Sequence, residues 1–113
     1  MKSGLDICIL GVGESGVGAA LLAKKKGLTF FVSDAGVVKK KFSEILDREG
    51  IQYETGKHSE DLILSSALLV KSPGIPKDAD IVKKVELKGI PVISDRVTKF
   101  YCLERGKDLV VAK

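Results

Sequence analysis

A glycine-rich stretch near the start of the chain limits the possible folds more than any other feature. Residues 11–16 read G-V-G-E-S-G, follow the apolar run 5–10 and precede a helical pattern. In a G-x-G-x-x-G loop the first glycine permits a tight turn, the second leaves room for a diphosphate, and the third lets the helix pack closely on the strand. The sequence therefore predicts a strand, a phosphate-binding loop and a helix in direct succession.

An acidic residue follows at the spacing that such a loop favours. A second apolar run, residues 28–33, ends at Asp34, eighteen residues after Gly16. Nucleotide-binding units of this kind place an acidic side chain near this position, facing a ribose hydroxyl. Asp34 could instead close a turn onto Ala35 and Gly36, and the sequence leaves this alternative open.

Apolar runs alternate with helix-period segments along the chain, which is typical of an α/β fold with a parallel sheet. Gly27, Gly50 and Gly89 each follow a helical segment and precede an apolar run, where a left-handed residue commonly ends a helix. The pattern predicts a Rossmann-like three-layer fold with a parallel five-stranded sheet in the order 3-2-1-4-5. The strands are expected at residues 5–10, 28–33, 51–54, 67–71 and 90–93.

The length of 113 residues suits one domain with a single core. We assign residues 1–106 to that domain. Residues 107–113 form a sixth strand-like run with no helix behind it, and an apolar strand at this place would leave an exposed edge. We therefore expect this segment to begin a strand that leads into a further domain.

Charge and composition argue against several classes of function. The net charge is +4, but no aromatic residues are interleaved with the lysines in the triplets 24–26 and 39–41, so a solvated surface is favoured over nucleic-acid binding. No apolar run is long enough to cross a membrane and no leader pattern is present, so we expect a cytoplasmic protein. Cys8 and Cys102 lack the spacing of a zinc site or a disulfide framework and are expected to be reduced thiols.

Two further segments are candidates for the same binding site. Ser72, Pro73 and Gly74 follow the fourth predicted strand, whose carboxyl end should lie beside the glycine loop at the topological switch point. Proline fixes φ and glycine is permissive, so this loop is expected to form a rigid second wall. Asp95 follows the fifth predicted strand and either caps the next helix or closes the ligand crevice, and the cap is favoured.

The sequence assigns no reaction to this site. The single histidine, His58, lies in a polar stretch without a nucleophile or a metal ligand near it, so we interpret it as a surface residue. No G-x-x-x-x-G-K-[ST] loop, nucleophile elbow or cluster of metal ligands occurs in the sequence. We therefore expect a binding site with neither a catalytic residue nor a metal.

The two loops together resemble those of one enzyme family. The segments I-L-G-V-G-E-S-G-V-G at 9–18, V-S-D at 32–34, K-S-P-G-I-P at 71–76 and G-I-P-V-I-S-D at 89–95 are similar to the amino-terminal domain of the Mur ligases. The likeness is strongest to the branch that adds D-glutamate, and it extends over about residues 5–101.

The resemblance implies the first domain of a three-domain cytoplasmic ligase of peptidoglycan synthesis. Such a ligase joins D-glutamate to UDP-N-acetylmuramoyl-L-alanine with ATP and magnesium, through an acyl phosphate. The first domain would hold the UDP moiety and be inactive alone. A central ATPase domain, missing here and preceded by a strand such as 109–112, and a carboxyl-terminal domain would bind ATP and the amino acid.

The resemblance also implies positions for the UDP moiety. Glu14, Ser15 and Gly16 would meet the diphosphate, together with the open backbone at Gly13. The uridine would lie against residues 34–36 and the opposite side of the nucleotide against residues 72–74. The full set is Gly13, Glu14, Ser15, Gly16, Asp34, Ala35, Gly36, Ser72, Pro73, Gly74 and Asp95.

One departure from the family and two alternative functions remain open. Family members often carry a polar or basic residue after the aspartate, whereas this chain has Ala35 and Gly36. An NAD-binding domain of a dehydrogenase or a regulatory subunit would share the glycine loop and the acidic residue. A small partner-binding module without a ligand is the other alternative.

Overall fold

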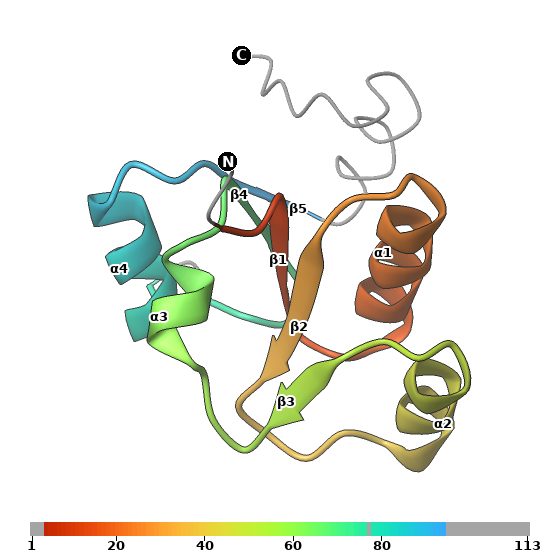
Figure 1. Cartoon of the computed structure of the whole chain (residues 1–113). Helices are drawn as coiled ribbons and strands as arrows, with labels where there is room; N and C mark the ends of the chain where they lie inside the picture. Colours follow the sequence, from red (N-terminus) through yellow and green to blue (C-terminus); the bar gives the residue numbers. More distant parts are fainter. Residues whose placement is uncertain (1–3, 77, 95–113) are drawn as a thin grey trace.

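The computed structural model describes residues 4–76 and 78–94, in which strands and helices alternate (Figure 1). The strands are β1 (Ile7–Leu10), β2 (Phe30–Asp34), β3 (Tyr53–Thr55), β4 (Leu68–Lys71) and β5 (Val92–Ser94), and the helices are α1 (Glu14–Lys25), α2 (Lys40–Arg48), α3 (Glu60–Ile63) and α4 (Asp80–Leu87). Every pair of neighbouring strands is parallel, and their order is β3-β2-β1-β4-β5. The predicted α/β class, parallel sheet and strand order 3-2-1-4-5 are confirmed.

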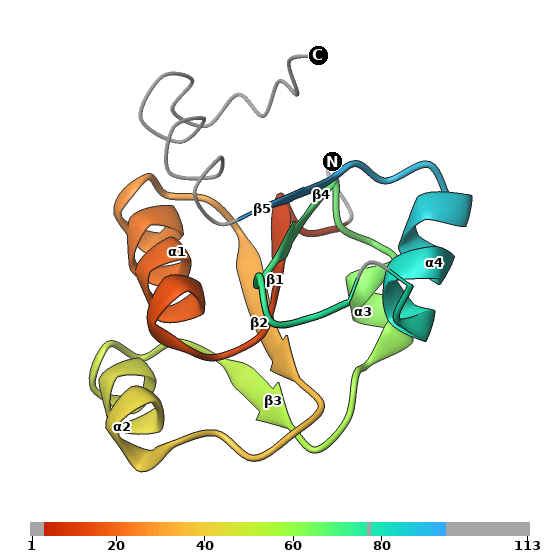
Figure 2. The same cartoon turned by 180° about the vertical axis from the view of Figure 1, so that it is seen from behind.

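The sheet lies between two pairs of helices, which gives the three predicted layers. Helices α1 and α2 cover one face, and α3 and α4 cover the other (Figure 1, Figure 2). Because side chains alternate along a strand, Ile7 and Ile9 of β1 belong to the core under α1 and α2. Cys8 and Leu10 belong to the core under α3 and α4. All four side chains are fully buried.

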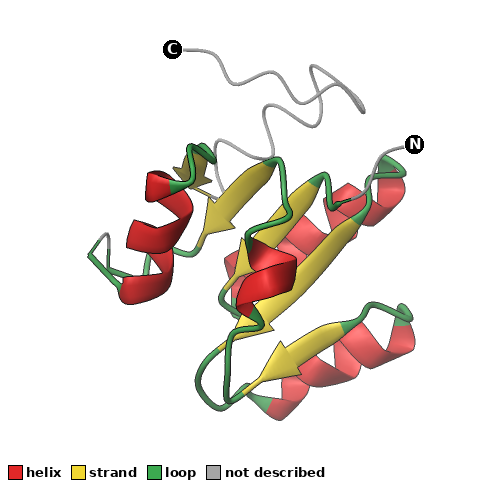
Figure 3. Cartoon of the chain, turned by 60° about the vertical axis from the view of Figure 1, so that its left-hand side comes forward, coloured by secondary structure: helices red, strands yellow, loops and turns green. Residues whose placement is uncertain are grey.

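The second face is covered less completely over β2 and β3 (Figure 3). Helix α3 has only four residues, whereas α1 has twelve and α2 has nine. On this face β2 and β3 carry the polar residues Ser33 and Glu54, and the loop that leads into α3 is hydrogen-bonded to them. A polar region therefore adjoins the carboxyl ends of these two strands.

Three glycines end the helices as predicted. Gly27, Gly50 and Gly89 have φ values of 73°, 69° and 86°. After each of them the chain donates a hydrogen bond back into the helix, from Leu28 to Ala23 (3.0 Å), from Ile51 to Leu46 (2.9 Å) and from Ile90 to Val85 (3.1 Å). This is the Schellman arrangement, which satisfies the last helical carbonyls and turns the chain toward the next strand.

Strands β1 and β2 begin two residues later than predicted because a reciprocal pairing precedes the ladder. The Asp6 amide donates to Thr29 Oγ1 and the Thr29 amide donates to Asp6 Oδ2, both at 2.9 Å. These side-chain bonds add to the backbone bonds that the Asp6 and Ile7 amides donate to Thr29 O at 3.0 Å and 3.1 Å.

Several predictions from the sequence concern residues beyond those described. Asp95, Cys102 and the strand expected at 107–113 all lie outside the described residues.

Cys8 is a free, buried thiol, as predicted. Burial, and to a smaller degree the charge of Glu54, raises the pKa of Cys8 to about 12.

Two glycines allow the end of β1 to pack closely on its neighbours, Gly16 on α1 and Gly11 beside the loop after β4. A Cβ atom at Gly16 would lie far inside van der Waals contact with the carbonyl oxygen of Gly11. Gly11 itself has φ 101°, and a Cβ there would come within 2.7 Å of Ser72 Cβ. The buried positions of α1 continue this close packing with Ala19, Ala20 and Ala23.

We expect Gly16→Ala to lower the free energy of unfolding by roughly 1–3 kcal/mol, because the methyl group must displace backbone rather than a flexible side chain. Urea unfolding measures the change. Gly74→Ala is the matched control, since a Cβ there would meet no atom within 4 Å and should change stability by less than about 0.5 kcal/mol. Equal stability of the two variants would contradict the proposed packing.

Candidate functional site

The glycine loop and the loop after β4 lie against each other at the carboxyl edge of the sheet. The Gly11 amide donates to Ser33 O at 2.8 Å and the Ser72 amide donates to Leu10 O at 3.0 Å, so both loops leave the sheet from the same end. A Cβ at Gly11 would also meet Ile75 Cδ1 at 3.4 Å. The expected neighbourhood of the two loops at the switch point is therefore observed.

The first turn of α1 offers unpaired backbone donors. Gly13 is the N-cap residue and supplies no side-chain cap. Within the described residues, the amides of Glu14, Ser15 and Gly16 have no acceptor, and the Ser15 hydroxyl makes no hydrogen bond. No atom would lie within 4 Å of a Cβ at Gly13. An anion can therefore approach these three amides without displacing protein atoms.

Asp34 ties the glycine loop to β2. Its Oδ2 accepts a hydrogen bond from the Val12 amide at 2.7 Å, and its Oδ1 accepts one from the Gly36 amide at 2.8 Å. The turn that the sequence left open is thus present. A carboxylate has further lone pairs, so these two bonds do not prevent Asp34 from accepting a hydrogen bond from a ligand.

The loop after β4 is braced by a lysine rather than by a special glycine conformation. Lys71 Nζ donates to Ile75 O at 2.7 Å and to Ser72 O at 3.3 Å. Gly74 is not among the described glycines with positive φ, so the loop does not depend on a left-handed conformation at this residue. The Ile75 amide also donates to Ser72 O at 3.0 Å, so three hydrogen bonds to backbone carbonyl oxygens hold the loop.

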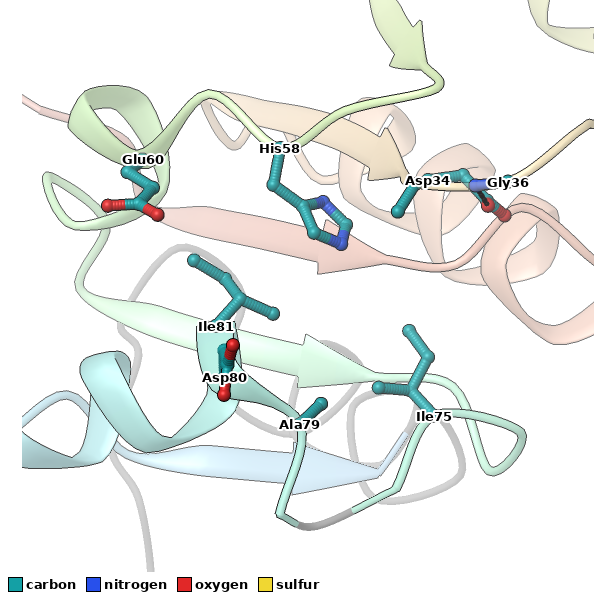
Figure 4. A pocket seen from close by; sticks show the side chains of 9 residues that line it. Asp34, Gly36, His58, Glu60, Ile75, Ala79, Asp80 and Ile81 are labelled. Atoms are coloured by element: carbon teal, nitrogen blue, oxygen red, sulfur yellow. Dashed lines mark hydrogen bonds between the residues drawn. The ribbon is translucent and has the colours of Figure 1, made fainter.

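A cavity of about 460 Å³ opens beside these loops (Figure 4). It lies between the end of β2, the loop before α3 and the start of α4. The residues that line it are Asp34, Ala35, Gly36, His58, Glu60, Ile75, Ala79, Asp80 and Ile81. Residues 34–36 were predicted for the site, whereas the glycine loop and residues 72–74 lie next to the cavity and do not line it.

His58 is not the unpartnered surface residue that the sequence suggested. It is half-buried, its Nδ1 lies 2.6 Å from Ser33 Oγ, and its ring projects from the loop into the cavity (Figure 4). The position of His58 in the sequence could have indicated a site residue. It follows β3 by three residues, at the edge of the sheet where the parallel strands all end.

Glu54 lies behind His58 and is held by three donors. The Ser59 amide and hydroxyl donate to its two oxygens at 2.6 Å and 2.5 Å, and Ser33 Oγ donates to Oε2 at 2.7 Å. Burial raises the pKa of Glu54, but the hydrogen bonds from Ser59 and Ser33 and the charge of Lys57 outweigh it. The pKa therefore lies below its ordinary value of 4.5, and Glu54 is ionised at neutral pH.

The cavity is lined by both carboxylates and aliphatic side chains. Asp34, Glu60 and Asp80 supply carboxylates, and Ile75 and Ile81 supply aliphatic surface. Lys84 Nζ donates to Glu60 Oε2 at 2.7 Å, and this hydrogen bond raises the pKa of Lys84. The pair joins α3 to α4 at the rim of the cavity.

Among the described residues, no group of His, Cys, Asp and Glu side chains is arranged to hold a metal ion. Nor does any described helix have the length and apolar character needed to cross a bilayer.

Comparison with known proteins shows the family to which this chain is similar. The family model described as "Mur ligase MurD-like, N-terminal domain" matches residues 5–94. The chain is 52% identical over 89 residues to the UDP-N-acetylmuramoylalanine–D-glutamate ligase of Bacteroides thetaiotaomicron and 55% identical over 89 residues to that of Cytophaga hutchinsonii. Each alignment covers 79% of this chain and 20% of the relative, so the chain spans about one fifth of the length of the relatives it matches.

A solved structure has a similar fold. The UDP-N-acetylmuramate-alanine ligase of Thermotoga maritima superposes with a TM-score of 0.70 and 22% sequence identity. The match covers 89% of this chain and 23% of that one. It supports the three-layer architecture.

We expect Asp34→Ala to release the glycine loop, because the amides of Val12 and Gly36 lose a charged acceptor. Hydrogen bonds to charged groups contribute roughly 1.5–3 kcal/mol, so exchange of these two amide hydrogens should accelerate by about tenfold or more. Amide exchange followed by NMR measures this. Asp61→Ala, an exposed change on α3, is the control, and unaltered protection at Val12 in Asp34→Ala would refute the role given to Asp34.

We expect Glu54 to make stability dependent on acid pH. Its folded pKa is depressed, so its contribution is complete above the pKa of the unfolded chain and is lost as the pH falls through the folded pKa. Between about pH 5 and about pH 3 the native chain should therefore lose more free energy of unfolding than Glu54→Gln. Urea unfolding at each pH tests this, with the exposed change Glu44→Gln as a control that keeps the native profile.

Proposed function

Because the chain belongs to the family of Mur ligase MurD-like N-terminal domains, we propose that it binds the UDP moiety of UDP-N-acetylmuramoyl-L-alanine. The whole protein would be an ATP-dependent ligase that adds D-glutamate to this substrate in peptidoglycan synthesis, as the names of the relatives indicate. The observation that carries the proposal is the open first turn of α1, where three backbone amides have no acceptor within the described residues and are free to bind an anion.

The diphosphate is assigned to the glycine loop. The amides of Glu14, Ser15 and Gly16 point out of the helix start, and the dipole of the twelve-residue helix α1 favours negative charge there. Gly13 leaves the approach open. Ser15, whose hydroxyl has no partner within the described residues, can add one further donor.

The uridine is assigned to the neighbouring cavity. Its volume of about 460 Å³ falls in the range of small-molecule sites. The carboxylates of Asp34, Glu60 and Asp80 would repel phosphate but accept hydrogen bonds from neutral hydroxyl or N–H groups. Residues 72–74 would stand on the opposite side of the nucleotide, held by Lys71. Asp95, by its place after β5, remains a candidate for the same crevice.

The chemistry of ligation belongs, in this proposal, to the rest of the longer protein. The sequence contains no G-x-x-x-x-G-K-[ST] loop, so ATP and magnesium would be held by a central domain to which residues 107–113 lead. The domain formed by residues 1–106 would be inactive alone and would work in the cytoplasm. Its own residues bind and orient the nucleotide.

Calorimetric titration of the chain with UDP and, separately, with NAD tests the proposal. Saturable heat with UDP and none with NAD is expected. The reverse result would favour a dinucleotide-binding domain, since that class shares the glycine loop and the acidic residue. Binding of neither ligand would indicate a loop that only packs a helix on a sheet.

Two substitutions at one position separate binding from folding. Gly13 has the extended backbone of an N-cap, with φ −135° and ψ −162°, so aspartate and serine should both cap α1 there and preserve stability. Gly13→Asp places a carboxylate where the diphosphate would lie and should weaken UDP binding by at least about tenfold relative to Gly13→Ser. Thermal unfolding checks that both variants fold. Equal UDP affinities of Gly13→Asp and Gly13→Ser would contradict the assignment of the diphosphate to this loop.

A further inference from the structure

The side chains behind the cavity form a chain of hydrogen bonds whose proton positions follow from their chemistry. Ser33 is fully buried, and its hydroxyl oxygen lies 2.7 Å from Glu54 Oε2 and 2.6 Å from His58 Nδ1. A hydroxyl has one hydrogen to donate. Glu54 is an ionised carboxylate that only accepts, so the Ser33 hydrogen points to Glu54.

The same argument fixes the tautomer of His58. With its hydrogen directed at Glu54, Ser33 Oγ presents a lone pair to Nδ1, so Nδ1 must carry a hydrogen. The alternative acceptor for Ser33, the Lys57 carbonyl oxygen at 3.3 Å, leads to the same result. Neutral His58 therefore has a bare Nε2. In free histidine the opposite tautomer predominates, so the network selects the less common form.

Nε2 has no partner among the described residues, and the ring that carries it projects into the cavity (Figure 4). Opposite the ring lies the aliphatic surface of Ile75 and Ile81, on which a flat base can pack. The other polar side chains that line the cavity, Asp34, Glu60 and Asp80, are carboxylates. The cavity thus presents acceptors and an apolar wall, which suits a planar ligand that has an N–H group on its edge.

We propose that His58 is a specificity-determining residue, whose Nε2 accepts a hydrogen bond from the imide N–H of uracil, with Ser33 and Glu54 as positioning residues. The inference rests on the proposed binding of UDP. The assignment predicts that the site distinguishes uracil from cytosine, because the ring nitrogen of cytosine at the same edge is an acceptor and would face Nε2 without a hydrogen between them. An unpaired buried polar atom on each side disfavours that complex.

The tautomer can be observed without any ligand. The chain has one histidine, so long-range nitrogen–proton NMR spectra contain one imidazole signal set. At about pH 8, where an ordinary imidazole is neutral, the native chain should show the Nδ1–H form. Ser33→Ala should return the ring to the Nε2–H form, whereas Glu60→Gln, which alters the same cavity outside the network, should leave it unchanged. An Nε2–H form in the native chain would overturn the proposal.

Binding tests the ligand half of the inference. The native chain should bind UDP at least about tenfold more tightly than CDP. His58→Asn keeps a donor near the position of Nδ1 but removes Nε2, and it should reduce this ratio to nearly one while its thermal unfolding stays close to native. Ser33→Ala should lower the ratio as well, and Glu44→Gln, an exposed change on α2 away from the cavity, is the control that keeps it.

The outcomes separate the two proposals. UDP binding with an unchanged UDP-to-CDP ratio in His58→Asn would overturn the role of His58 and leave the proposed function intact. Failure of the native chain to bind UDP would overturn the proposed function and the uracil assignment together. A ratio that collapses in His58→Asn and Ser33→Ala, but not in Glu44→Gln, supports the proposal.

Discussion

The carboxylate of Asp34 is the interaction on which the rest of this site depends. Through the amides of Val12 and Gly36 it fixes the glycine loop and the turn after β2 to one another. Without that link the two loops would leave the sheet independently, because between them only the single bond from Gly11 to Ser33 O continues the ladder. The open amides of α1 and the wall of the cavity therefore share one anchor, and the anchor is itself a group that a ligand can reach.

The edge of the sheet presents two opposite electrostatic environments side by side. The helix start offers N–H groups and a favourable dipole, while the cavity offers three carboxylates. A ligand that spans both must be anionic at one end and neutral, with hydrogen-bond donors, at the other. A sugar nucleotide has this distribution of charge, and a free phosphate or a dicarboxylate does not. In the proposed complex the contrast would also orient the ligand, since the reversed pose would place phosphate against Asp34, Glu60 and Asp80.

The fold and the open glycine loop at the start of α1 could be predicted from the sequence, and the polar network around His58 could not. Gly16 and Gly27 act through backbone geometry that a short local pattern reveals, and Asp34 stands at a spacing set by the length of one strand–helix unit. His58 depends on contacts with Ser33 and Glu54, which lie on two different strands. Only the parallel register, which pairs Ser33 with Glu54, brings them together, and no local pattern records that pairing.

The polar network exists because one layer of the fold is incomplete. A longer helix in place of α3 would cover β2 and β3 with aliphatic side chains, as α1 and α2 do on the opposite face. With four residues α3 cannot do so, and the loop before it brings Ser59 and His58 onto the sheet instead. Alternation along the strands then requires Ser33 and Glu54 to satisfy each other and that loop, since both point to this face. Because the helix is short, this part of the sheet carries a polar surface in place of core. That surface can form hydrogen bonds with a ligand, and it lies at the edge where parallel sheets of this kind bind ligands.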